Sequence, residues 1–188
     1  MSGSSTWVYE AGVGTLELWP LSPTPPVLER LLRFLFEEHW QEITFGPLIQ
    51  GSAWELRSVA RPRLFLHDGY LTVDFEPSHF HLCIGPHCGD PGAPTPAALA
   101  AERRTSRAEL FRRINRDGTP DTWGGRLFNG AQEQQITVLF PNPFVSDGNR
   151  FLDPPDWSRL KLWNDVRRMF LGLPEDASDR AGRRMIYP

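Results

Sequence analysis

The chain has 188 residues, of which 40% are hydrophobic and 23% charged, and its formal net charge is −3. This composition is typical of one folded domain, and the small negative charge argues against a general nucleic-acid or membrane binder. No apolar run approaches the ~20 residues that a membrane-spanning helix needs, and the N-terminus lacks the basic-then-apolar pattern of a secretory signal. We therefore expect a cytoplasmic protein whose two cysteines remain reduced.

The first half of the chain predicts strands around one helix. Residues 7–19 predict one or two strands, interrupted by glycines, and Thr24 followed by two prolines is typical of a helix start. Apolar residues at helical spacing then predict a helix over residues 26–40. Short segments rich in β-branched or aromatic residues predict strands over residues 43–45, 52–59, 63–67, 71–75 and 79–84. Asp68-Gly69 is a strong hairpin-turn signal between two of them.

The second half predicts a loop over residues 85–96 and an arginine-rich helix over residues 96–115. Two strands (residues 122–129 and 134–140), a loop and a third helix from about 157 to 171 follow, with Asp156 and Gly172 as its caps. Strands follow one another without regular βαβ alternation, which favours an α+β fold. We expect a single domain over residues 7–173, built on an antiparallel β-sheet with about three helices packed mainly on one face. Residues 1–6 and 174–188 should be loose termini.

The most informative segment is residues 79–89, which holds three of the five histidines and both cysteines. His79, His81 and Cys83 alternate with apolar residues, so on a strand they share one face. Imidazole and thiolate are common ligands of transition metals. His87 and Cys88 follow in a Gly-Pro turn, but a second Cys-x-x-Cys half of a structural zinc site is missing.

The preceding strand predicts which side chains accompany the histidines. Pairing the two strands so that apolar residues share one face places Glu76 opposite His79 and Asp74 opposite His81. A two-residue turn gives this register, and we expect a four-residue loop to keep it. Directly opposed residues have Cβ atoms ~5 Å apart, so the two carboxylates should lie beside the two imidazoles.

These observations predict one transition-metal ion, which would be iron, zinc or copper. Its ligands would come from a set of imidazoles and thiols: His79, His81, Cys83, His87 and Cys88. The residues expected to act on a substrate are Asp74, Glu76, His81 and Arg126. Cys83 and Cys88 remain open as ligands, free thiols or a disulfide pair.

Residues 79–85 resemble the signature of the histidine-triad nucleotide hydrolases and transferases, in which histidines alternate with apolar residues. The resemblance implies that His81 is the nucleophile toward a phosphate. Cys83 stands where the family has its third histidine, and the segment lies in the middle of the chain. The likeness covers only these seven residues.

Three functions are compatible with the pattern. The leading hypothesis is a metal-dependent oxidoreductase acting on a small, largely apolar substrate. The second is a non-catalytic metal- or tetrapyrrole-binding carrier or accessory protein. The third is a phosphate-ester hydrolase with a histidine nucleophile. The arginine face of the second helix, with Arg103, Arg104 and Arg107, is expected to suit a protein partner.

Overall fold

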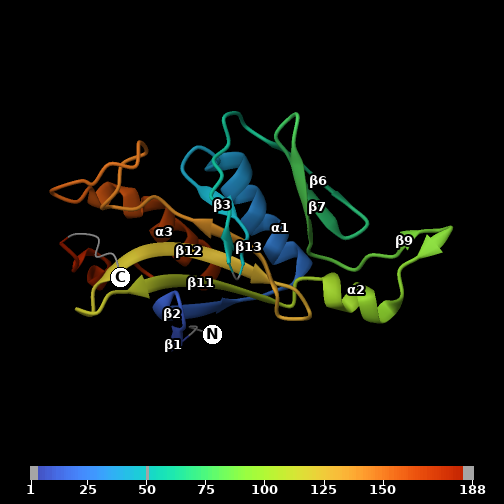
Figure 1. Ribbon diagram of the computed structural model, residues 1–188, viewed down its shortest axis with the longest axis horizontal. Coiled ribbons are helices and arrows are strands. Elements are labelled where there is room, and N and C mark those ends of the chain that lie inside the picture. The colour runs from blue at the N-terminus through green and yellow to red at the C-terminus, as the bar shows by residue number, and fades with distance from the viewer. Residues whose placement is uncertain (1–3, 50, 184–188) are drawn as a thin grey trace. The chain divides into compact units, whose positions relative to one another are not determined.

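The computed structural model describes residues 4–49 and 51–183 (Figure 1). The fold is α+β, as the sequence predicts. The chain forms two compact units. One contains the residues up to Leu21, Glu109–Gly125 and the residues from Leu139 onward, and the other contains Ser22–Ala108 and Arg126–Val138. Among the described residues, no helix is long and apolar enough to cross a membrane.

The longest sheet has six strands in the order β1-β2-β11-β12-β13-β3. Their bounds are Thr6–Glu10, Gly14–Leu21, Arg107–Ile114, Pro120–Phe128, Gln134–Leu139 and Thr44–Gly46. A separate three-stranded sheet has the order β6-β7-β8 (Arg63–His67, Tyr70–Asp74 and His79–Cys83), and both of its pairings are antiparallel. Two short hairpins complete the strands: β4-β5 (Leu48–Ile49, Ser52–Ala53) and β9-β10 (Gly89–Asp90, Ala93–Pro94).

The first and third predicted helices are confirmed. Helix α1 (Pro25–Arg33) continues into the π-helical turn η1 (Phe34–Glu38). The third helix is built from η2 (Trp157–Leu160), α3 (Lys161–Val166) and η3 (Arg167–Leu171). Asp156 accepts a hydrogen bond from the backbone N–H of Ser158, and Gly172 ends the helix at a φ of 67°, where glycine is favoured.

The second predicted helix, over residues 96–115, is wrong in its longer part. Helix α2 spans only Ala97–Arg103, and Arg107–Ile114 forms strand β11. Arginine, glutamate and leucine are good helix formers, but helix propensity is a weak determinant of structure and tertiary pairing overrides it here. The segment lies between β2 and β12 in the six-stranded sheet, and most of its side chains are buried on both faces.

Each unit has its own aromatic core. In the unit that contains both chain ends, the buried rings of Trp19 and Trp163 pack edge to face, with centroids 5.6 Å apart. In the other unit, the centroid of Phe36 lies 5.0 Å from that of Phe45 and 5.6 Å from that of Phe80. Phe75 stacks on Phe45 at 5.3 Å. This phenylalanine cluster anchors one face of the three-stranded sheet and leaves its other face for the polar residues.

Part of the segment after Pro174 forms secondary structure. Residues 177–180 form the short 3₁₀-helix η4, and Asp179 within it is buried. The outermost residues of both predicted loose termini, 1–3 and 184–188, lie outside the described part of the chain. The domain limits drawn at residues 7 and 173 remain a prediction.

Candidate functional site

The candidate site is one face of the three-stranded sheet, which we call the histidine face. Its register aligns the side chains in three rows across β6, β7 and β8. The rows are Arg63–Asp74–His79, Phe65–Thr72–His81 and His67–Tyr70–Cys83. The opposite face carries Leu64, Leu66, Leu71, Val73, Phe80 and Leu82. The predicted division into a polar and an apolar face is therefore confirmed.

The predicted register is wrong: residues 75–78 form a four-residue loop, and this loop does not keep the expected pairing of Glu76 with His79 and of Asp74 with His81. The backbone N–H of Phe75 donates to the carbonyl oxygen of Ser78 at 2.8 Å. As a result, Asp74 pairs with His79 and Thr72 with His81. The shift by two residues keeps every side chain on its predicted face, because side chains alternate with a period of two.

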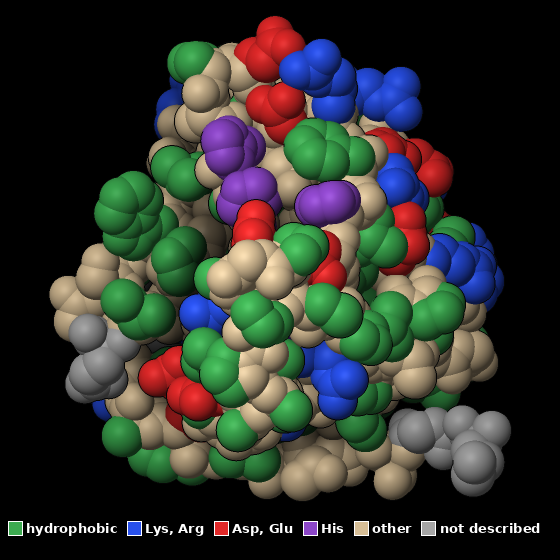
Figure 2. Space-filling view, turned by 90° about the vertical axis from the view of Figure 1, so that its right-hand side faces the viewer, with side chains coloured by type: hydrophobic (Ala, Val, Ile, Leu, Met, Phe, Trp, Pro, Cys, Tyr) green, Lys and Arg blue, Asp and Glu red, His purple; other side chains and the backbone are tan. Residues whose placement is uncertain are grey.

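Two of the three rows are open to solvent. His79, His81 and His67 are exposed, and Phe65 keeps 50% of its surface accessible. Figure 2 shows histidine side chains gathered on the surface, with hydrophobic side chains beside them. An exposed phenyl ring among imidazoles is a surface suited to a flat aromatic ligand.

The His81 ring is held in place by a buried neighbour. The hydroxyl of Thr72 and Nδ1 of His81 share a hydrogen bond of 2.8 Å. The ring of His79 lies edge-on to that of His81, with centroids 4.9 Å apart. A hydrogen bond at Nδ1 fixes the orientation of an imidazole and leaves Nε2 as the nitrogen that can meet a ligand.

The two carboxylates of the predicted site, Asp74 and Glu76, accept hydrogen bonds from Arg63. Arg63 donates to Asp74 at 2.9 Å and also contacts Glu76. The pKa of Asp74 is lowered, first by the hydrogen bond from the backbone N–H of Glu76 and then by Arg63. These contacts stabilise the ionised form of Asp74 at the end of the hairpin, so Asp74 is poorly suited to accept a proton.

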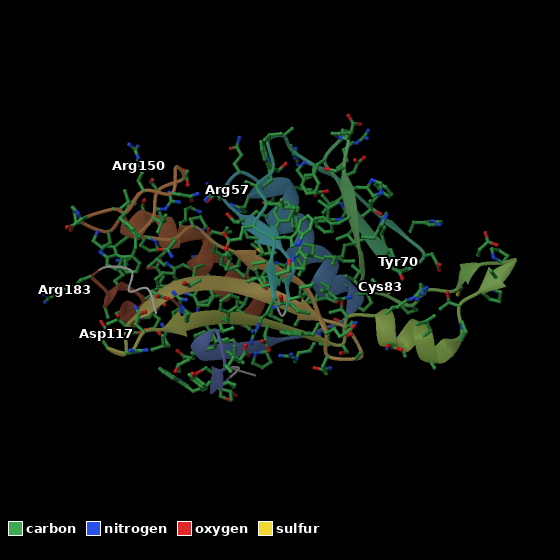
Figure 3. The ribbon with its side chains drawn as sticks, viewed as in Figure 1. Arg57, Tyr70, Cys83, Asp117, Arg150 and Arg183 are labelled. Atoms are coloured by element: carbon green, nitrogen blue, oxygen red, sulfur yellow. The ribbon has the colours of Figure 1, made fainter. Side chains whose placement is uncertain are left out.

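The third row is covered at Cys83 and partly at Tyr70, whereas its His67 is exposed. Cys83 is buried, and its thiol lies 3.5 Å from the carbonyl oxygen of Gly85. Burial raises the pKa of the Cys83 thiol, and burial together with the neighbouring Cys83 raises the pKa of Tyr70 (Figure 3). The His87 ring packs against Tyr70 with centroids 5.1 Å apart. A protonated, buried thiol is a weak nucleophile and a weak metal ligand.

Hydrogen bonds join the turn that follows β8, at Cys88 and Gly89, to the turn between β6 and β7, at Asp68. The Asp68 carboxylate accepts hydrogen bonds from the backbone N–H groups of Cys88 and Gly89, each at 2.8 Å, and these bonds lower its pKa. Gly69 has a φ of 75°, and a Cβ at this position would lie 2.3 Å from the carbonyl oxygen of Pro86. Glycine is therefore required there by both conformation and space.

The predicted metal ion and the metal-dependent oxidoreductase are wrong. Within residues 4–49 and 51–183, no three side chains of histidine, cysteine, aspartate or glutamate converge as metal ligands. The sheet brings His79 and His81 together, but Cys83 is buried at the end of β8, His87 is buried beyond that strand against Tyr70, and Cys88 is exposed. Both cysteines are free thiols.

The remaining arginines of the prediction lie on other elements. Arg126 is buried on β12, with its guanidinium 5.2 Å from the centre of the Phe128 ring. Arg103 ends α2, Arg104 caps it, and Arg107 begins β11, where its guanidinium stacks 3.4 Å from the centre of the Phe128 ring. The three arginines therefore do not form one helix face, although Arg103 reaches the Tyr70 hydroxyl.

Sequence reasoning missed His67 and Phe65, which complete two of the rows. The signal was present, because a two-residue turn at Asp68-Gly69 pairs His67 with Tyr70. Alternation then places Phe65 opposite Thr72 and hence in the row of His81.

The structure thus defines an α+β protein that carries an exposed histidine face on a small antiparallel sheet. The chain belongs to the family described as "Family of unknown function (DUF7676)", whose model matches residues 5–172. No curated protein matches it. A solved structure titled "Crystal structure of ChuX" is 14% identical, with a TM-score of 0.44 over 73% of this chain and 68% of that chain. A similarity of this size does not bear on function.

Proposed function

We propose that this chain is a non-catalytic binding or accessory protein that holds a tetrapyrrole on its histidine face. The observation that carries the proposal is the exposed His81 ring, which is fixed through Nδ1 by Thr72, lies beside His79 and shares its row with the exposed Phe65. The proposal replaces the oxidoreductase hypothesis, which required a bare ion.

The number of ligands distinguishes the two hypotheses. A bare transition-metal ion needs at least three protein donors, and the described residues offer no such group. A haem supplies the in-plane donors itself, so that the protein contributes only one or two axial ligands. Two adjacent exposed imidazoles fit the second requirement and not the first.

The Thr72–His81 hydrogen bond supports a defined role for His81. When Nδ1 donates its proton to the Thr72 oxygen, the lone pair resides on Nε2, which is the atom that can bind a haem iron. A carbonyl, carboxylate or hydroxyl partner at the far nitrogen is the usual arrangement for histidine ligands. His79 is then the second candidate ligand, because its ring lies 4.9 Å from that of His81.

Phe65 offers an apolar contact to a macrocycle on this face. Three strands span about 10 Å across the sheet. On the histidine face, the register places Phe65, which keeps 50% of its surface accessible, in the row of His81.

A cationic group lies beside the covered row. Arg103 contacts the Tyr70 hydroxyl, and Arg104 lies close enough to influence Cys83. Biological tetrapyrroles carry acidic side chains, which these arginines would pair with. A protein that delivers or accepts the tetrapyrrole would bind near Arg103 and Arg104. The proposal places this exchange in the cytoplasm.

A titration with haem and with an iron-free porphyrin tests the proposal. The wild type should develop a saturable visible absorption change with haem, and the His79→Ala/His81→Ala double variant should bind at least tenfold more weakly. The iron-free porphyrin should bind both proteins alike, because it needs no axial ligand. His39→Ala is the matched control, since His39 bonds to Glu42 away from the face. Equal haem affinity in the wild type and the double variant would refute the proposal.

A further inference from the structure

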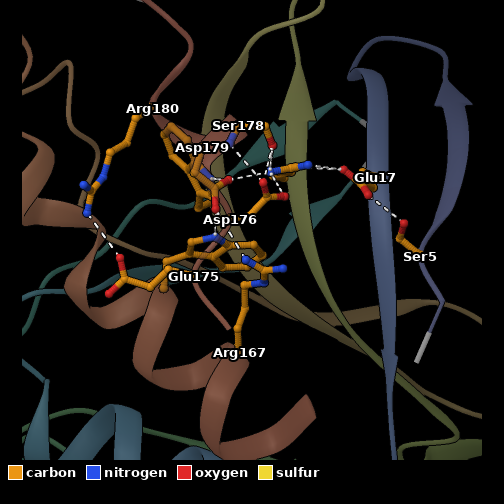
Figure 4. Close-up of polar contacts among 11 residues, drawn as sticks. Ser5, Glu17, Arg167, Glu175, Asp176, Ser178, Asp179 and Arg180 are labelled. Atoms are coloured by element: carbon orange, nitrogen blue, oxygen red, sulfur yellow. Dashed lines mark hydrogen bonds and ion pairs between the residues drawn. The ribbon is translucent and has the colours of Figure 1, made fainter. Parts of the chain in front are cut away.

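A second polar cluster lies in the other compact unit and takes no part in the proposed function. It centres on Asp179, whose side chain is only 1% exposed. One carboxylate oxygen accepts hydrogen bonds from Arg112 at 2.7 Å and from the Trp123 indole at 2.8 Å. The other accepts from the Trp163 indole at 2.8 Å and lies 3.5 Å from Nη1 of Arg167 (Figure 4). Two cations and two indole N–H groups thus converge on one carboxylate.

Arg167 retains hydrogen-bonding capacity in this cluster. Its side chain is 5% exposed, yet within the described chain Nε and Nη1 have no hydrogen-bond partner. Its guanidinium lies 5.3 Å from the ring centre of Trp19 and 5.4 Å from that of Trp163. A buried guanidinium between indole rings, with only a long contact to an anion, favours an anion at this point.

The donors and the acceptor come from different parts of the chain. The donor residues all lie within residues 5–172, the part that matches the family, whereas Asp179 lies beyond it. Asp179 belongs to the C-terminal segment (residues 173–183), most of which is exposed or half-buried apart from Asp179 and Gly182. Asp176 from the same segment also contacts Arg112, at 3.0 Å.

The charges show what the cluster requires without the C-terminal segment. Arg112 would keep Glu17, which lies 2.7 Å away and is itself buried, whereas Arg167 would keep no carboxylate among the contacts described. Two guanidinium groups and one carboxylate leave a net charge of +1 in a buried site with two unpaired indole donors. A buried unpaired cation is strongly unfavourable, so the site needs a monovalent anion.

We propose that these donors form a carboxylate-binding site of the family domain, which this chain fills with its own Asp179. The donors approach two separate oxygens, Arg112 and Trp123 on one and Trp163 on the other, and this is the geometry of a planar carboxylate. A net charge of +1 without Asp179 suits a monoanion better than a phosphate. The C-terminal segment is thus an intramolecular ligand, and a carboxylate-bearing molecule is the class of ligand that would compete with it.

Chemical rescue tests this site directly. In Asp179→Gly the missing side chain has the size of acetate, so acetate should raise the melting temperature of the variant saturably at constant ionic strength. At a tenfold excess over its dissociation constant, acetate should increase the ratio of folded to unfolded protein about elevenfold. Sodium chloride at equal concentration should have no such effect, and the wild type should not respond to acetate.

Two further variants sharpen the outcome. Asp179→Asn fills the space with an amide and should show no acetate response, and Glu175→Gly removes an exposed carboxylate of the same segment and should behave like the wild type. If Asp179→Gly does not fold in chloride, recovery of the folded state in acetate is the expected result. Equal behaviour in acetate and chloride, folded or unfolded, would overturn the proposal.

Discussion

Replacement of Asp179 by asparagine should be among the most destabilising single changes in the chain. The carboxylate receives hydrogen bonds from Arg112, Trp123 and Trp163, and it is buried. Asparagine keeps the size, but it removes the negative charge and turns an NH₂ group toward donors. Breaking a buried, hydrogen-bonded ion pair costs about 3–5 kcal/mol, and each kcal/mol lowers the melting temperature by roughly 2–4 °C in a domain of this size. A decrease of roughly 6–20 °C is therefore expected.

Urea unfolding followed by tryptophan fluorescence measures the loss, because Trp123 and Trp163 belong to the cluster. Glu175→Gln is the control. Glu175 is an acidic residue of the same segment, but its contact with Arg180 is long, at 3.3 Å, and exposed, so its loss should stay within about 0.5 kcal/mol. If the asparagine variant is no less stable than this control, the carboxylate does not have the role described.

Three other predictions concern the two turns of the histidine face. The Cys88 and Gly89 amides lower the pKa of Asp68. The Asp68 carboxylate therefore stabilises the folded turn fully above the unfolded pKa of about 3.9, and this stabilisation is lost as the pH falls through the lower pKa of the folded state. In the wild type, those two amides should lose their protection from hydrogen exchange over that pH range. In Asp68→Ala they should be unprotected at every pH. Iodoacetamide at pH 8 should label Cys88 much faster than Cys83, which is buried with a raised pKa; equal rates by mass spectrometry would contradict the covered row. Gly69→Ala should lower the melting temperature more than Gly118→Ala, because both have positive φ but only the first meets a neighbouring backbone; equal losses would count against that contact.

The histidine face could be predicted because its information is local. Strand side chains alternate, so the faces of His79, His81 and Cys83 follow from their spacing alone. The same holds for the helix ends at Asp156 and Gly172, where capping depends on neighbouring residues.

The errors arose where distant segments decide. Residues 107–114 have helix-favouring side chains, but pairing within the six-stranded sheet makes them β11. Asp74 was expected opposite His81 and lies opposite His79 instead, and Arg63 from β6 also binds its carboxylate. The alternation of histidines and cysteine along one strand could not show that Arg63 would bind Asp74 or that Cys83 would be buried.

The cluster around Asp179 had no signal in the sequence. The residues after Pro174 are mostly polar and resemble a loose terminus, and Asp179 is one of several acidic side chains there. Its partners Arg112, Trp123 and Trp163 lie far away along the chain. Only the fold brings them together, so their roles follow from three-dimensional contacts and not from spacing.

The central claim is that His81 binds a haem iron from the histidine face. The most direct measurement is the visible absorption spectrum of haem mixed with the His81→Ala variant, before and after addition of free imidazole. We predict that the variant loses the absorption band typical of an imidazole-bound iron and that added imidazole restores it. A haem spectrum that is the same in the wild type and in His81→Ala, with no response to imidazole, would contradict the claim.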